Sequence, residues 1–360
     1  MNNFLLFIKY IMKISLGDII IMGIYYEEIM GNKQTSFLSM FNDKWSEELS
    51  DHNMPYSHAE QIIMGNRLRP IILAWGYYSN TSNIEHEQIL DFAICIELIH
   101  KASILLDDLI DNDNARHCLK TFHVEYSKTE TILYAIFLIN RSVTIMYEKD
   151  LTNSSLHTST LFKIINNMCK GGIKEVTSNG FFTVQDVIEI IDLETTSLIE
   201  NSFLLGYQLS NKLINKMPNE IFNIGHLCGH CFQILNDLEP FLAPETNKSY
   251  KGSINYDFER NRKNIIMSYL YGSCTKKERS NLMDANDFKY VYSLICKYKI
   301  TDLILEDLKS KVNSIINSMS LLEKTNPLYY SDFAKFLNYM FCTCFEKCGL
   351  VFANNFLDKR

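Results

Sequence analysis

The sequence carries an acidic motif in which two aspartates are spaced one helical turn apart. Asp107 and Asp111 follow an apolar stretch, and Asp108 stands next to the first of them. On a helix, Asp107 and Asp111 share a face, whereas Asp108 lies about 100° further round. Two carboxylates on one face repel each other unless a cation lies between them. Mg²⁺ prefers such oxygen ligands and keeps water or substrate phosphate among its others. The motif therefore predicts either a helix that presents Mg²⁺ to a diphosphate or a solvated acidic helix end.

A second group of oxygen donors stands at the polar end of a later apolar stretch. It comprises Asn236, Asp237 and Glu239, all of which offer oxygen atoms to a metal site. The loop that follows carries Lys248 and Lys251, whose ammonium groups could bind a diphosphate. We therefore expect the two acidic motifs to face each other across the mouth of one cavity.

This combination of groups suits the departure of diphosphate from an allylic carbon. Mg²⁺ and basic side chains stabilise the leaving group as negative charge develops on it. An apolar pocket without water would then hold the carbocation until a nucleophile arrives.

Helices are the elements that must position these residues. The chain has 47% hydrophobic residues, only six prolines and 14 glycines, which favours long helices over a turn-rich β fold. No convincing run of alternating residues predicts a strand. The sequence predicts an all-α fold, a large helical bundle around a central apolar cavity. Helical spacing of apolar residues covers 57–78, 85–111, 128–148, 158–170, 184–210, 218–239, 301–322 and 329–347, with loops at 112–122 and 240–256.

Composition excludes some classes of protein. The net charge of −7 and the pI near 5.8 argue against nucleic acid as a partner, which would require a basic stripe. Ten cysteines without paired spacing are typical of reduced thiols and predict a cytoplasmic protein.

The sequence divides into a short N-terminal segment and one long domain. Residues 1–32 are interpreted as an N-terminal extension, either an extra helix or a segment upstream of the true start, and residues 33–360 as one all-α domain. Charged residues interrupt every apolar run before it reaches 18 residues, so no transmembrane helix is predicted and membrane contact is at most peripheral.

Four motifs in order along the chain resemble those of the trans-isoprenyl diphosphate synthases, or polyprenyl synthetases. Gly65–Pro70 corresponds to Gly-Lys-Arg-x-Arg-Pro, and Glu97–Asp111 matches Glu-x-x-His-x-Ala-Ser-x-x-x-Asp-Asp-x-x-Asp. Arg116–His123 corresponds to Arg-Arg-Gly-x-x-Thr-x-His, and Phe232–Pro240 to Phe-Gln-x-x-Asp-Asp-x-x-Asp. The resemblance covers about residues 55 to 270 and identifies the chain as a divergent prenyl-synthase-like protein.

This resemblance implies the isoprenoid-synthase fold, usually as a homodimer, and two or three Mg²⁺ ions bound with the diphosphate. The residues expected to be catalytic are Asp107, Asp108, Asp111 and Arg116. Asp107 and Asp111 would hold the metal with Asn236 and Asp237, and Asp108 would orient its neighbours. The residues expected to bind substrate are Arg69, His100, Arg116, Gln233, Lys248 and Lys251, with Arg69 and His100 at positions for isopentenyl diphosphate.

Departures from the family pattern affect mostly the second substrate. Asn66 and His117 stand where cations are expected, and Glu194 places an anion where a diphosphate-binding lysine is expected. In the last motif Asn236 still offers an oxygen, whereas Pro240 offers no ligand. Each lost charge-assisted bond costs on the order of 1.5–3 kcal/mol. The half of the site that releases diphosphate is therefore more complete than the half for isopentenyl diphosphate.

Three functions remain open at this point. The first is synthesis of a linear (E)-polyprenyl diphosphate from an allylic prenyl diphosphate and isopentenyl diphosphate. The second keeps the ionisation but uses another acceptor, either a peptide or the substrate's own double bond, as in terpene cyclisation. The third is a non-catalytic regulatory subunit of a prenyl synthase. For the first, Ala102 and Ser103 just before the acidic motif are small, so they leave room for a long chain in the pocket beneath it.

Two weaker patterns favour core packing. Cys228 and Cys231 form a CxxC inside a predicted helix without a partner pair, which indicates buried thiols. His226 and His230 are spaced to share a helix face, but no carboxylate stands at a suitable spacing beside them. We therefore expect packed histidines there.

Overall fold

The computed structural model describes most of the chain between residues 32 and 341. The described ranges are 32–50, 54–79, 87–116, 119–149, 154–177, 180, 182–210, 219–242, 264–283, 288–323, 330–331, 333–337 and 341. Residues 1–31 of the predicted N-terminal extension lie outside them, as do His117, Lys248 and Lys251.

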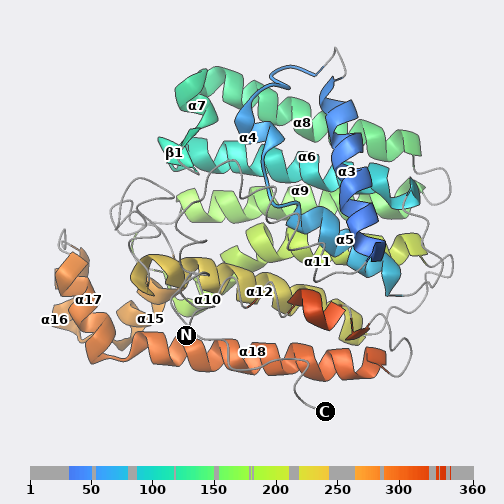
Figure 1. The fold of residues 1–360 in the computed structure, drawn as a ribbon. Helices are drawn as coiled ribbons and strands as arrows, with labels where there is room; N and C mark the ends of the chain where they lie inside the picture. Colours follow the sequence, from blue (N-terminus) through green and yellow to red (C-terminus); the bar gives the residue numbers. More distant parts are fainter. Residues whose placement is uncertain are drawn as a thin grey trace, which may run out of the picture.

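The predicted all-α architecture is confirmed in the described residues (Figure 1). Long helices α6 (Glu87–Ile110), α8 (Lys128–Lys149), α9 (Ser154–Thr177), α12 (Asn219–Leu242) and α18 (Ile300–Glu323) run roughly side by side in the view of Figure 1. Shorter helices complete the bundle: α3 (Asn32–Ser50), α4 (Glu60–Ile63), α5 (Leu68–Tyr78), α7 (Phe122–Glu125), α10 (Val184–Ile191), α11 (Ser197–Ser210), α15 (Ile265–Ser273), α16 (Lys276–Met283) and α17 (Phe288–Lys297).

Packing proceeds through the bundle helix by helix. Helix α6 packs on α8 and α5, α5 on α11, α11 on α12, and α12 on α18. Helices α5 and α11 cross without room for side chains, because a Cβ at Gly76 would collide with the Phe203 carbonyl oxygen and one at Gly206 with that of Leu73. This close crossing fixes where the start of α5 lies relative to α6 and α12.

Aromatic side chains pack the core beside α3 and between α5, α11 and Phe333. Trp45 of α3 is buried, as its sequence context predicts, and stacks on Phe41 at 6.3 Å between ring centroids. Trp75 of α5 lies 5.0 Å from the ring of Phe333, which also stacks on Phe203 of α11. These contacts tie the C-terminal segment to the centre of the bundle.

Two local features differ from the sequence-based expectation. The helical pattern predicted over 57–78 is interrupted between α4 and α5, where Gly65 has φ +145° and Arg67 has φ +54°. A left-handed conformation is costly for a residue with a Cβ. Arg67 is held in it by contacts to Glu97 and to the Trp45 ring. The predicted loop over 112–122 contains a small antiparallel pair, β1 (Ala115–Arg116) and β2 (Leu119–Lys120).

A single π-helical turn, η1 (Asp192–Thr196), joins α10 to α11 without a break in the helix. Such turns widen the helix locally and occur often at functional sites. It contacts α9, α11 and α12. None of the helices in the described ranges is long and apolar enough to cross a membrane.

Candidate active site

The first acidic motif lies at the C-terminal end of α6. The Asp111 amide donates a 2.9 Å hydrogen bond to the Asp107 carbonyl oxygen, so the helical turn continues between them. The Asp107 side chain is 53% exposed and Asp111 is half-buried. As the spacing predicts, these two aspartates are separated by one helical turn, and their carboxylates are the kind of oxygen donors that a hydrated Mg²⁺ accepts.

Arg116 folds back onto this motif from strand β1. Its Nη2 lies 2.7 Å from Asp108 Oδ1 and 3.1 Å from Asp107 Oδ2, and its Nε donates to Asp108 Oδ1 at 2.8 Å. Asp108 is buried, and burial raises the pKa of its carboxyl to about 6 although Arg116 pulls the pKa down. Asp108 therefore anchors Arg116, which suits an orienting residue better than a metal ligand.

The two expected metal ligands of the second motif differ in their exposure to solvent. Asn236 is exposed, so its side-chain oxygen is accessible. Asp237 is buried, with Oδ1 accepting from Gln233 Nε2 at 2.8 Å and Oδ2 from the Ile265 amide at 2.9 Å. Of the two residues expected to bind metal here, Asn236 is the accessible donor, and Asp237 holds Gln233 and the start of α15.

Thr195 of η1 contacts the second motif directly. Its Oγ1 donates a 2.8 Å hydrogen bond to Gln233 Oε1 of α12. The charges of Asp107 and Asp111 contribute to the rise in the pKa of the neighbouring Glu194. Sequence reasoning did not identify η1 as part of the site.

Glu194, which was expected to introduce an anion, lies where burial disfavours the charged carboxylate. Burial, and after it the charges of Glu175, Asp107 and Asp111, raise the pKa of its carboxyl to about 9. Its side chain packs against Gly171 of α9, where a Cβ atom would collide with Glu194 Cγ. In the metal-free chain, Glu194 therefore keeps its proton at neutral pH.

Arg69 and His100 come together on the side of the site formed by α5 and α6. Arg69 Nη1 lies 3.0 Å from His100 Nε2, and its guanidinium lies 5.7 Å from the centre of the Phe232 ring. Burial and then the charge of Arg69 keep the pKa of His100 well below its usual value, so the imidazole is neutral and Nε2 accepts from Arg69. Phe232 brings α12 to this pair, so three helices position the Arg69 guanidinium.

Sequence reasoning missed a buried ion cluster behind this guanidinium. Glu97 Oε1 accepts from Arg67 Nη1 at 2.6 Å and lies 3.9 Å from Lys101 Nζ. Lys101 Nζ also donates to the carbonyl oxygens of Gln61 and Met64. The sequence does contain a signal for this cluster, namely a glutamate and a lysine four residues apart within a largely apolar stretch. Together they attach the segment between α4 and α5 to α6.

The remaining predicted residues are placed only in part. Ala102 is fully buried on α6, and the half-buried Ser103 donates to the His100 carbonyl oxygen at 2.8 Å. Lys248, Lys251 and His117 fall outside the described residues, and the structure gives no side-chain environment for Pro240. Cys228 and Cys231 are buried, as the CxxC interpretation predicted.

Comparison with known proteins gives consistent matches. A sequence profile of the family described as "Polyprenyl synthetase" matches residues 53–292. The chain is 23% identical over 316 residues to a geranylgeranyl diphosphate synthase of Saccharolobus solfataricus, covering 80% of this chain and 91% of that protein. It is 28% identical over 183 residues to heptaprenyl diphosphate synthase component 2 of Geobacillus stearothermophilus, covering 50% and 55%.

Solved structures show the same fold. The crystal structure of a geranylgeranyl pyrophosphate synthetase from Pyrococcus horikoshii superposes with a TM-score of 0.74 at 19% identity, covering 88% of this chain and 99% of that one. A polyprenyl synthetase from Streptomyces coelicolor gives a TM-score of 0.73 at 16% identity, covering 85% and 97%.

Proposed function

The chain belongs to the polyprenyl synthetase family and is a prenyltransferase, and we propose that it joins an allylic prenyl diphosphate to isopentenyl diphosphate, giving a linear (E)-polyprenyl diphosphate. The observation that carries this proposal is the arrangement of Asp107, Asp111 and Arg116 at the end of α6. It combines the exposed carboxylate of Asp107 and the half-buried one of Asp111 with a guanidinium that is held in place by Asp108.

We propose Mg²⁺ as the cofactor, held by Asp107, Asp111 and Asn236, with Asp237 supporting Asn236 through the fixed end of α12. When bound, the metal would stabilise the negative charge that develops on the departing diphosphate. The donor set fits because all three side chains present oxygen atoms and none is enclosed in the core. Arg116 would add the positive charge of its guanidinium for the same diphosphate.

The proposed binding of the acceptor substrate involves Arg69, His100 and Gln233. The guanidinium of Arg69 is fixed by the neutral His100 and by the Phe232 ring, so it offers a preorganised cation for a second diphosphate. Gln233 is held between Thr195 and Asp237 and cannot turn away from the site without breaking two hydrogen bonds. These positioned groups support isopentenyl diphosphate as the acceptor despite Asn66 and Glu194.

Two further properties belong to the proposal. Small side chains at Ala102 and Ser103 support a long product, because a bulky ring at either position would occupy the space next to the acidic motif. Exposed apolar side chains on the contacting helices α8 and α9, among them Leu133, Ile136 and Ile173, support a homodimer. We propose residues 33–360 as one functional domain.

Incubation of the purified chain with Mg²⁺ and geranyl, farnesyl or geranylgeranyl diphosphate, with and without isopentenyl diphosphate, tests the activity. Product analysis by mass spectrometry should show elongated diphosphates only when isopentenyl diphosphate is present. Asp107→Ala should abolish them. The matched control is Glu148→Ala, an exposed carboxylate at the far end of the α6–α8 pair, where Lys149 lies 3.8 Å from Asp91.

Release of pyrophosphate with a hydrocarbon or alcohol in the absence of isopentenyl diphosphate would contradict this acceptor and indicate cyclisation. Transfer of the prenyl group to an added peptide would contradict it in favour of a peptide acceptor. No turnover of any substrate would contradict the proposal as a whole.

A further inference from the structure

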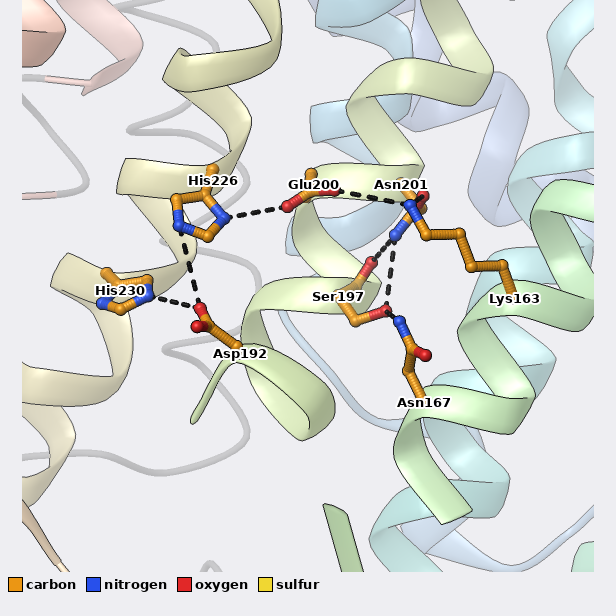
Figure 2. A network of polar contacts seen from close by, with 8 residues as sticks. All are labelled: Lys163, Asn167, Asp192, Ser197, Glu200, Asn201, His226 and His230. Atoms are coloured by element: carbon orange, nitrogen blue, oxygen red, sulfur yellow. Dashed lines mark hydrogen bonds and ion pairs between the residues drawn. The ribbon is translucent and has the colours of Figure 1, made fainter. Parts of the chain in front are cut away.

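Two histidines of α12 share a face that looks onto the π-helical turn η1. Figure 2 shows His226 and His230 projecting from this helix toward Asp192, the first residue of η1. Asp192 Oδ1 lies 2.5 Å from His230 Nε2 and 3.7 Å from His226 Nε2. The expectation that this pair has no suitable carboxylate is therefore corrected, because the carboxylate comes from a different helical element.

A second carboxylate fixes the protonation of His226. Glu200 Oε2 lies 2.9 Å from His226 Nδ1, on the opposite side of the ring from Asp192 (Figure 2). An ionised carboxylate only accepts hydrogen bonds, so Nδ1 must carry a proton. In the neutral imidazole, the lone pair of Nε2 then faces a carboxylate oxygen at 3.7 Å. A second imidazole proton, a water molecule or a metal ion could bridge the two atoms.

His230 adds a third donor atom from within the core. Its side chain is 6% exposed, and its Nε2 points at the same oxygen of Asp192 that His226 faces. The ligand atoms of Asp192, His226 and His230 all lie within 4.8 Å of one another. Asp192 and His226 are 37% and 35% exposed, so an ion and a water molecule can reach the cluster from one side.

We propose that Asp192, His226 and His230 form a binding site for Zn²⁺ that is separate from the acidic motif on α6. Two imidazoles and one carboxylate, with a fourth position open to water, are a common ligand set for this ion. Mg²⁺ prefers sites made of oxygen atoms, so the two sites select different metals.

The distances allow such a site with small movements. Around a tetrahedral ion with bonds of about 2.0–2.2 Å, ligand atoms lie roughly 3.3–3.5 Å apart. The gap of 3.7 Å between His226 Nε2 and Asp192 Oδ1 would close slightly, and the 2.5 Å contact to His230 would open by less than roughly 1 Å.

The surrounding charges suit a divalent cation. Asp192 and Glu200 place two carboxylates beside the two imidazoles, and Glu200 also contacts Lys163. Glu200 orients His226 as carboxylates commonly orient ligating histidines. The nearest described cations are directed to carboxylates, since Lys163 Nζ lies 3.8 Å from Glu200 Oε1 and Lys311 Nζ lies 2.7 Å from Asp307 Oδ1.

A metal ion here would link η1 to α12 one turn away from the hydrogen bond between Thr195 and Gln233. We therefore assign the site a structural role, in which the ion holds η1 against α12 beside the second acidic motif. Because the ion would bind the folded chain only, it should raise the melting temperature in proportion to the logarithm of its excess over Kd. The site is independent of which acceptor the enzyme uses.

The test uses the full chain, stripped of metal and kept reduced, and titrated with Zn²⁺ and with Co²⁺. An Asp107→Asn, Asp111→Asn background removes the acidic motif as a competing site. We expect one ion per chain, the visible absorption of tetrahedral Co²⁺, and a higher melting temperature. His226→Gln and His230→Gln should each weaken binding at least tenfold. The matched control is His58→Gln, which removes an exposed histidine and should leave binding unchanged.

The site would be overturned if Co²⁺ gives no tetrahedral spectrum or if the two histidine variants bind Zn²⁺ as the parent chain does. The latter result would place the ion on other side chains, such as the exposed thiols of Cys169 and Cys296. Should a histidine variant fail to fold, Asp192→Asn keeps the size of the side chain and removes its charge. Tenfold weaker binding with an unchanged circular dichroism spectrum would then support the site, and unchanged binding would overturn it.

Discussion

The guanidinium of Arg116 contacts the buried carboxylate of Asp108 through two nitrogens, at 2.8 and 2.7 Å. This pair is formed between the end of α6 and strand β1, and it holds the guanidinium beside Asp107. Asp108 thus serves the acidic motif by positioning a cation, whereas its neighbours Asp107 and Asp111 offer accessible oxygen atoms.

From this pair we predict that Asp108→Asn lowers kcat/KM for the allylic diphosphate about 10- to 100-fold, as expected when an orienting partner is lost. Arg116 would keep a hydrogen bond to the amide but lose its buried counter-charge. The concentration of Mg²⁺ needed for half-maximal rate should stay the same, since Asp108 is not proposed as a ligand. Steady-state kinetics at several Mg²⁺ concentrations measure both quantities.

Asp107→Asn is the matched comparison, because it removes a proposed ligand one residue away with the same chemical change. It should raise the Mg²⁺ requirement. An equal rise in Asp108→Asn would contradict the orienting role.

A second prediction concerns the pH dependence of stability. Burial lowers the pKa of Lys101 from 10.5 to about 8 in the folded chain. Between these values the unfolded chain binds a proton that the folded chain has lost, so this group makes the free energy of unfolding rise with pH. Between pH 8 and pH 10.5, the free energy of unfolding of the wild type should rise by up to about 3 kcal/mol relative to that of Lys101→Met, at 1.36 kcal/mol per pKa unit. Urea unfolding at a series of pH values measures the difference.

Lys299→Met is the control for this experiment, because it removes a lysine that is exposed on the surface. Its difference from wild type should not change across the same pH range. A difference for Lys101→Met that is also independent of pH would show that the ammonium has an ordinary pKa in the folded chain.

Local signals in the sequence were enough for the helices and for the first acidic motif. Spacing alone placed Asp107 and Asp111 one turn apart, and scarce glycine and proline indicated the helical bundle. What the sequence could not supply were contacts between distant segments. The π-helical turn η1 brings Asp192 to His230, and Thr195 to Gln233. No periodicity encodes such pairs, because their geometry follows from how α11 packs on α12.

The conformation of Arg67 shows the same limit at a smaller scale. The predicted helical pattern extends across 64–67 although Gly65 and Asn66 are local signals for a break, and nothing local indicates that Arg67 itself is left-handed. The helix is interrupted because Glu97 and Lys101, on another helix, bind the side chain of Arg67 and the backbone of the preceding segment. Tertiary contacts therefore override a helical propensity that is worth only tenths of a kcal/mol per residue.

A third prediction restores the cation expected at Glu194. Glu194→Lys should lower KM for the allylic diphosphate about tenfold, because one charge-assisted hydrogen bond is worth on the order of 1.5–3 kcal/mol. The charges of Asp107 and Asp111 act on a group at this position. Initial-rate kinetics at saturating isopentenyl diphosphate give the KM.

Glu194→Gln serves as the control, since it keeps the size of the side chain without adding a cation. It should leave KM within about twofold of wild type. An unchanged or higher KM in Glu194→Lys, with a normal melting temperature, would show that the position does not reach the diphosphate.

The last prediction addresses product length through Ser103. This side chain is half-buried on α6, one turn before Asp107, and next to the fully buried Ala102. Ser103→Phe should shorten the longest product, because the ring would occupy space beside the growing chain. Ser103→Ala removes only the hydrogen bond to the His100 carbonyl oxygen and should leave the product unchanged. Mass spectrometry of the extracted diphosphates compares the two variants with wild type. The same product distribution in all three would show that the chain grows along a different face of α6, and Ser103 would then have no part in setting its length.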